Sequence, residues 1–208
     1  LERVLEAAKT FSLPSNKDIV EVIPQEYIVD DQTGIKEPLG LKGIRLEAKI
    51  LAVGGFIPYI EAVSDSLIQA NIEVKDVILG PTASAKAVLD EQEKELGVAV
   101  VDLGAGTTSI SVFEEGEMIY TSVIPIGMQN VRNDIAIGLK ISIDAADKIL
   151  EELGSHILGE ATIRRRAIDL GKEELVIKEK DLKDIAKARV EEIFELVDEK
   201  LTEIERSG

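Results

Sequence analysis

Apolar residues recur with two different periods along this chain, which predicts a mixed fold of strands and helices. The strand period is clearest over residues 40–53, where the apolar positions are Ile44, Leu46, Ala48 and Ile50. We expect Gly54 and Gly55 to end this strand. From Phe56 the apolar residues recur every three or four positions, which predicts an amphipathic helix that ends at Asn71.

The flanking segments complete the same module. Helical spacing predicts a short helix over residues 1–9, and β-branched residues predict a strand over residues 19–30 that is interrupted by Pro24. A strand over residues 74–79 and an alanine-rich helix over residues 80–89 follow. Strand, strand, helix and strand in close succession are typical of a compact α+β module.

The segment over residues 98–126 carries the clearest candidate chemistry. An apolar strand leads to Asp102 and then to a turn of small residues, and two further strands follow around Gly116. The turn consists of Gly104, Ala105, Gly106, Thr107 and Thr108. Such a turn is suited to phosphate, because glycine lets a ligand approach the backbone N–H groups and threonine hydroxyls donate hydrogen bonds. Asp102 stands where it could orient a metal-bound water.

Beyond this hairpin the helical period returns. Apolar spacing predicts one helix over residues 131–139 and a second with Ser142 as its N-cap and Gly154 as its C-terminal stop. A short strand at residues 175–177 precedes a helix of about 25 residues, which we expect Asp181 to cap.

Composition and charge exclude several classes of function. The chain has no cysteine and a single histidine, which rules out disulfides and thiolate metal sites and argues against zinc enzymes and serine–histidine hydrolases. A net charge of −16 and 3% aromatic residues argue against nucleic-acid binding. No apolar stretch approaches membrane-spanning length. Because the chain begins at Leu1 and ends directly after a helical pattern, we expect both ends to be cut from a longer protein.

Two segments resemble a known family. The sequence VIPQEYIVD at residues 22–30, continued by GIKEPLGLKGIRLEAK at residues 34–49, resembles the bacterial actin-like cell-division proteins of the FtsA family. Residues 100–127, continued to residue 136, are similar to the second phosphate-binding hairpin of the same family. The hairpin alone indicates only the superfamily of sugar kinases, chaperones and actins, whereas the first segment is narrow. The resemblance covers nearly the whole chain.

The resemblance implies a partial actin-like ATPase fold, of mixed α+β and α/β class, in four parts. Residues 1–78 resemble the family's SHS2-like 1C subdomain, and residues 79–97 resemble the return segment of subdomain 1A. Residues 98–126 resemble the phosphate hairpin of subdomain 2A, and residues 127–208 resemble subdomain 2B. In the family, membrane attachment is through a C-terminal amphipathic helix that we do not find in this sequence.

The resemblance also implies ATP and Mg²⁺ as cofactors of the full-length parent. The positions that match the nucleotide site are Asp102, Gly104, Ala105, Gly106, Thr107, Thr108, Gly127 and Asp147, with Asp102 placed to orient Mg²⁺-bound water. The sequence departs from the family pattern at Ala105, Ser109 and Leu150, where glycine, aspartate and lysine are common. Because nucleotide is normally held between two opposing hairpins, we expect this chain alone to bind ATP poorly and to show no ATPase activity.

Two candidate contacts have structural alternatives. Asp134 and Asp147 could contact metal or ribose, but an aspartate early in a helix also interacts favourably with the helix dipole. Arg189, followed by Glu191 and Glu192, matches an Arg-x-Glu-Glu pattern that in the family lies near the groove for the C-terminal tail of tubulin-like FtsZ. The alternative for Arg189 is ordinary pairing with carboxylates such as Glu192 along one helix.

The expected function is therefore that of a cell-division protein. The resemblance implies an ATP-binding protein that assembles into filaments at the inner face of the cell membrane and tethers FtsZ in the division ring. It also implies that other division proteins bind through residues 1–78. The alternative is a non-catalytic scaffold or interaction module, related to FtsA or to the pilus-assembly protein PilM, which Ser109 and Leu150 favour.

Overall fold

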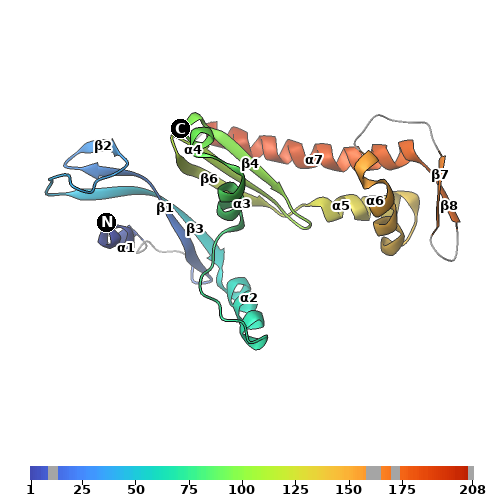
Figure 1. The fold of residues 1–208 in the computed structure, drawn as a ribbon, viewed down its shortest axis with the longest axis horizontal. Helices are drawn as coiled ribbons and strands as arrows, with labels where there is room; N and C mark the ends of the chain where they lie inside the picture. Colours follow the sequence, from blue (N-terminus) through green and yellow to red (C-terminus); the bar gives the residue numbers. More distant parts are fainter. Residues whose placement is uncertain (9–13, 158–164, 170–173, 206–208) are drawn as a thin grey trace. The chain divides into compact units, whose positions relative to one another are not determined.

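A computed structural model of the chain describes residues 1–8, 14–157, 165–169 and 174–205 (Figure 1). Its backbone contacts divide the chain into two compact units. The first unit comprises Leu1–Val100 and Ile110–Thr121, and the second comprises Val101–Ser109 and Ser122–Gly208. The boundary between the units passes through the central hairpin. The division into four family subdomains stays a prediction.

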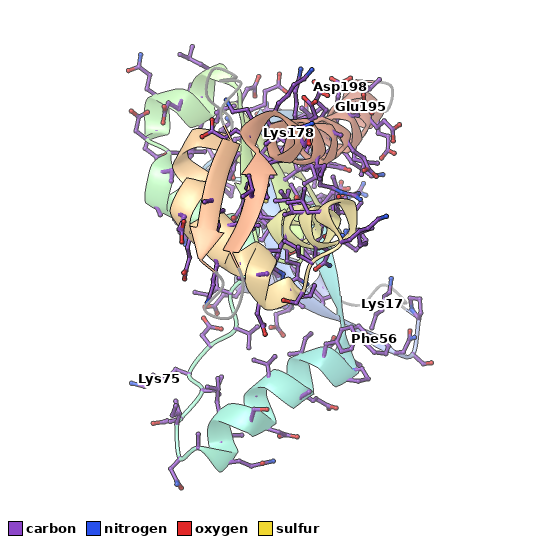
Figure 2. The ribbon with its side chains drawn as sticks, turned by 90° about the vertical axis from the view of Figure 1, so that its right-hand side faces the viewer. Lys17, Phe56, Lys75, Lys178, Glu195 and Asp198 are labelled. Carbon is purple, nitrogen blue, oxygen red and sulfur yellow. The ribbon has the colours of Figure 1, made fainter. Side chains whose placement is uncertain are left out.

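The first unit begins with an antiparallel sheet in the order β2-β1-β3. Its elements are α1 (Glu2–Ala8), β1 (Lys17–Val29), β2 (Gln32–Ile35), β3 (Leu46–Phe56), α2 (Ile57–Gln69), α3 (Gly80–Val88) and α4 (Glu91–Leu96). Helix α2 follows β3 directly, and Phe56 lies at this junction (Figure 2). Phe56 packs edge-on against Tyr59 with ring centroids 5.0 Å apart. Asn71 has a positive φ of 58° just after α2, which confirms the predicted end of this helix.

Two sequence-based expectations in this unit are wrong, and one helix was not predicted. Strand β3 continues through Gly54 and Gly55, because both pair with β1 in the ladder. A Cβ at Gly55 would lie 2.7 Å from the side chains of Val20 and Ile60, so the glycine permits close packing and does not end the strand. Residues 74–79 are described without helix or strand, because propensity alone does not provide a ladder partner. Helix α4 was not expected, and Asp90 and Glu93 form a capping box at its start.

The central hairpin forms as the sequence predicted. Strands β4 (Val98–Leu103), β5 (Thr108–Glu114) and β6 (Glu117–Ile124) form a sheet in the order β4-β5-β6. Glu115 and Gly116 connect β5 to β6 with φ values of 50° and 88°. A tight hairpin turn whose twist matches that of its strands requires a positive φ at two consecutive residues. Glycine adopts a positive φ without strain.

The second unit is a helical layer with a small two-stranded sheet. It contains α5 (Met128–Leu139), α6 (Ile143–Ile157), β7 (Arg165–Asp169), β8 (Glu174–Lys178) and α7 (Glu179–Glu205). Helix α5 packs against both α6 and α7. The buried cluster between them consists of Val131, Ile135, Ala136, Ala146, Ile149, Ile168, Ile177, Leu182 and Ala186.

Some helix ends of this unit lie where the sequence predicted them, and others do not. Ser142 caps α6 as predicted, since its Oγ accepts from the N–H of Ala145 at 3.2 Å. Helix α6 continues past Gly154 to Ile157, so a glycine inside a helical pattern did not mark its end. Helix α7 begins at Glu179, which leaves Asp181 inside its first turn. Strand β7 was not expected, because only its pairing with β8 identifies it.

Among the residues that the structure describes, none of the helices combines the length and the hydropathy needed to cross a membrane.

We expect a large loss of stability when a side chain of α5 in the buried cluster of the second unit is truncated. Ile135 is fully buried, and we expect Ile135→Ala to lower the free energy of unfolding by about 3 kcal/mol because it leaves a cavity. Ile137 on the same helix is 74% exposed, so Ile137→Ala is the matched control. Urea unfolding followed by circular dichroism measures both. Equal effects of the two substitutions would contradict this assignment of the core.

Candidate functional site

The turn between β4 and β5 is held at the start of helix α5. Within the turn, the N–H of Gly104 donates to the carbonyl of Thr107 at 2.9 Å. At the helix, the N–H groups of Met128 and Gln129 donate to the carbonyls of Gly104 and Ala105 at 2.9 and 2.8 Å. The first N–H groups of a helix have no acceptors within the helix. Here the turn provides carbonyl acceptors for two of these N–H groups.

Gly127 allows this close approach. A Cβ at this position would lie 2.5 Å from the carbonyl oxygens of both Gly104 and Ala105, which is closer than real contacts allow. The N–H of Gly127 donates to Oδ1 of Asn130 at 3.2 Å, which helps to fix the beginning of α5. Gly127 is one of the positions that match the nucleotide site. The packing of the turn on the helix is a structural reason for glycine at this position.

Two carbonyl groups of the turn bond to the helix, and three of its N–H groups remain as donors. Within the described part of the chain, the backbone N–H groups of Ala105, Gly106 and Thr107 donate no hydrogen bond. All three residues are exposed. Successive N–H groups that are free of internal partners form the kind of concavity that binds anions. The turn therefore has the donors that a phosphate group needs.

The two threonines of the turn have different environments. Thr107 is exposed, whereas Thr108 is fully buried and its Oγ1 donates to the carbonyl of Ile126 at 2.8 Å. Thr108 thus ties β5 to the segment that enters α5. Of the two hydroxyls, that of Thr107 is the one open to a ligand.

Asp102 lies next to the end of β4 and is exposed. No group of three or more histidine, cysteine, aspartate or glutamate residues that could hold a metal ion occurs among the described residues. Mg²⁺ is usually bound by one or two carboxylates together with water and phosphate oxygens. The position of Asp102 therefore fits a Mg²⁺ ion that arrives with a nucleotide, and it does not provide a protein-only metal site.

Asp147 does not lie alone on α6. Its Oδ2 is 3.6 Å from Nη1 of Arg132, which comes from α5. Asp147 is exposed, whereas Leu150 one turn later packs against the buried cluster. The sequence did not single out Arg132, because nothing local indicates that it lies beside Asp147.

Arg189 binds two carboxylates. Its Nε and Nη2 donate to Asp134 on α5 at 2.6 and 3.2 Å, and its Nη1 donates to Glu192 at 2.6 Å. The hydrogen bond to Asp134 is the main reason that the pKa of Arg189 is raised above its ordinary value, and the nearby charge of Asp134 acts in the same direction. The expected pairing with Glu192 is present, and the contact with Asp134 links α5 to α7. Asp134 is thus engaged by an arginine of the chain itself.

Comparison with sequence families identifies relatives over both units. The family model described as "Cell division protein FtsA" matches residues 99–207. The model described as "SHS2 domain inserted in FTSA" matches residues 1–53. The cell division protein FtsA of Bacillus subtilis is 36% identical over 97% of this chain, and that of Pseudomonas aeruginosa is 37% identical over 100% of it. The aligned regions cover 46% and 50% of those proteins, so the chain spans about half the length of these relatives.

Solved structures show the fold. The PilM-PilN type IV pilus biogenesis complex matches with a TM-score of 0.64 and 13% identity, over 98% of this chain and 50% of that one. MreB 5 of Spiroplasma citri, solved with AMPPNP, matches with a TM-score of 0.54 and 18% identity, over 69% of this chain and 46% of that one. These likenesses confirm the predicted actin-like ATPase fold. The two family matches and the relatives at 36% and 37% identity establish that this chain belongs to the FtsA family of cell division proteins.

Proposed function

We propose that this chain is part of an ATP-binding, filament-forming tether that attaches FtsZ to the cell membrane during division. Membership of the FtsA family supports the cell-division role. The observation that carries the nucleotide proposal is the turn at residues 104–107. Two of its carbonyls accept from α5, and three of its N–H groups donate to no acceptor among the described residues. The site of action in this proposal is the inner face of the membrane at the division site.

In the nucleotide proposal, the chain's own residues bind and orient the phosphates. The N–H groups of Ala105, Gly106 and Thr107 would donate to phosphate oxygens, and Asp102 would orient the water around Mg²⁺. A bound Mg²⁺ would neutralise phosphate charge. The MreB 5 structure with AMPPNP supports this proposal, because that protein shares the fold and binds a nucleotide analogue. ATP would then act as a switch of subunit contacts more than as a substrate for rapid hydrolysis.

In the partner proposal, α7 binds the C-terminal tail of FtsZ near Arg189. The Arg189 side chain is 21% exposed, so part of it is open to a partner. Further along α7, Glu195 and Asp198 are exposed (Figure 2). Arg189 would therefore be a positive group on a largely acidic helix. We further propose self-association of the chain and binding of other division proteins through residues 1–78, the region that includes the SHS2 match.

One observation favours the scaffold alternative. Leu150 packs into the core and Asp147 is already paired with Arg132, so α6 offers few free groups to a nucleoside. A scaffold would keep the fold and its partner surfaces without binding ATP. Nucleotide titration distinguishes these two functions.

Two glycine substitutions test the nucleotide proposal. A Cβ at Gly106 would meet only Nε2 of Gln129, at 4.0 Å, so we expect Gly106→Ala to leave stability unchanged. In the complex the same methyl group would crowd the phosphates, and we expect affinity for Mg-ATP to fall about tenfold. Gly127→Ala should lower the free energy of unfolding by about 2 kcal/mol, because the carbonyls of the turn must move.

Amide chemical-shift titration of the chain with Mg-ATP measures the affinity, and thermal unfolding gives the stability. If the Gly106→Ala variant binds Mg-ATP as tightly as the unchanged chain, the turn is not part of the nucleotide site. We expect this chain alone to bind Mg-ATP weakly, so the titration extends to high concentration. Failure of Mg-ATP to shift the Ala105 or Gly106 amides at any concentration would favour the scaffold.

Reversal of charge tests the partner proposal. We expect the chain to bind a synthetic FtsZ tail peptide with micromolar affinity, about −8 kcal/mol, in a calorimetric titration. Arg189→Glu should weaken this binding at least about tenfold. It should also lower the free energy of unfolding by about 2 kcal/mol, since hydrogen bonds between charged groups are lost between α5 and α7.

A charge-swapped pair separates these two effects. Asp134→Arg combined with Arg189→Glu restores an ion pair between α5 and α7 and should recover most of the lost stability. If Arg189 contacts the tail, affinity stays low in this double variant. If affinity recovers together with stability, Arg189 supports the helix packing and is not part of the tail site.

A further inference from the structure

The connection between β2 and β3 exposes three large apolar side chains. Residues 36–45 form this loop without helix or strand, at the end of the sheet opposite to α2 (Figure 1). Leu39 is 79% exposed, Leu41 53% and Ile44 101%, so Ile44 is as open to water as in an extended chain. Single exposed apolar side chains are common, but several together mark a surface that contacts another molecule.

Backbone hydrogen bonds and close packing hold this loop in one shape. The Asp30 carboxylate accepts from the N–H of Ile44 at 2.9 Å and from that of Arg45 at 2.8 Å. The N–H of Asp30 donates to the carbonyl of Arg45 at 3.1 Å. A Cβ at Gly43 would collide with the side chain of Val29, so the loop lies directly on the sheet. The exposure of the apolar side chains is therefore part of a fixed structure.

The same loop is basic, although the chain is acidic. Residues 36–45 contain Lys36, Lys42 and Arg45 but one carboxylate, whereas the whole chain has a net charge of −16. The ion pairs of Lys36 and Arg45 join exposed side chains, and such pairs bind weakly in water. Lys42 is exposed and has no ion pair with any described residue. All three cations are therefore available to an anionic partner.

Apolar side chains beside cations match the surface of an anionic membrane. There the apolar groups enter the boundary between headgroups and acyl chains, while lysine and arginine meet anionic lipid. A peptide is instead held in a groove or along a sheet edge, and the exposures of Leu39 and Ile44 show that they protrude. The carboxylates elsewhere in the chain oppose this contact only weakly, because salt screens charges more than about 8 Å apart at physiological ionic strength.

We propose that residues 36–45 insert into the surface of an anionic membrane, with Leu39, Leu41 and Ile44 at the interface and Lys42 on the lipid headgroups. The contact adds to the proposed tether and rests on that function only for its location at the membrane. Three apolar side chains give a weak and reversible contact. In a filament, many such loops act together, so assembly would strengthen the attachment.

Flotation of the 208-residue chain with lipid vesicles measures this contact. One set of vesicles consists of phosphatidylcholine alone, and the other contains an equal amount of phosphatidylglycerol. We expect the chain to float with the anionic vesicles at low salt. Binding to the neutral vesicles, or to the anionic vesicles at high salt, should be at least about tenfold weaker.

Substitutions in the loop identify the side chains that bind lipid. Leu39→Ser and Ile44→Ser change exposed groups, so we expect thermal unfolding to stay the same while each weakens vesicle binding about tenfold. Lys42→Glu should weaken binding to the anionic vesicles and not to the neutral ones. Ile78 lies in the same unit and is 58% exposed, so Ile78→Ser is the matched control and should bind as the unchanged chain does.

A tryptophan reporter distinguishes insertion from adsorption. The chain has no tryptophan, so Leu39→Trp introduces a single one at the proposed point of insertion. We expect its emission to shift to the blue with anionic vesicles and to be quenched by lipids that carry bromine on the acyl chains. Ile78→Trp should show neither change.

Two results would overturn the membrane contact. One is that the unchanged chain does not float with anionic vesicles at low salt. The other is that Leu39→Ser and Ile44→Ser float as well as the unchanged chain does. In either case the loop binds no membrane, and its apolar side chains are left to a protein partner. The proposed cell-division function still stands, because binding of Mg-ATP and of the FtsZ tail is measured separately.

Discussion

The second unit depends on the hydrogen bonds between the β4–β5 turn and the first turn of α5. A helix begins with N–H groups that its own backbone cannot satisfy, and here the carbonyls of Gly104 and Ala105 accept two of them. The arrangement requires glycine at position 127, because any side chain there would meet the same two carbonyls. It also commits the carbonyls of Gly104 and Ala105 to the helix.

Helix α5 connects this turn to the rest of the second unit. Its inner face is buried against α6 and α7 through residues such as Ile135, so the helix is held in place by packing. Two ion pairs extend from the same helix, one from Arg132 to Asp147 on α6 and one from Asp134 to Arg189 on α7. The proposed phosphate and tail contacts therefore both involve α5 or a side chain paired with it.

The two ion pairs of α5 differ in a way that bears on function. Arg189 is bound by two carboxylates at short distance and contributes to the joining of α5 and α7. Arg132 is bound loosely, and its buried Nε has no hydrogen-bond partner among the described residues. An arginine of the first kind is largely satisfied by its own protein, whereas one of the second kind is suited to a ligand.

Local sequence determined the elements whose signals are complete within a few residues. The hairpin around Gly116, the Ser142 cap and the end of α2 at Asn71 follow from backbone conformation and capping, and the family follows from the segment at residues 22–49. Tertiary structure decided what depends on residues far apart in the chain. Pairing with β1 carried β3 through Gly54 and Gly55. The bond of Thr108 to Ile126 and the pairing of Arg189 with Asp134, 55 residues away, have no local signal. Such contacts depend on which surfaces the fold brings together, which local periodicity does not specify.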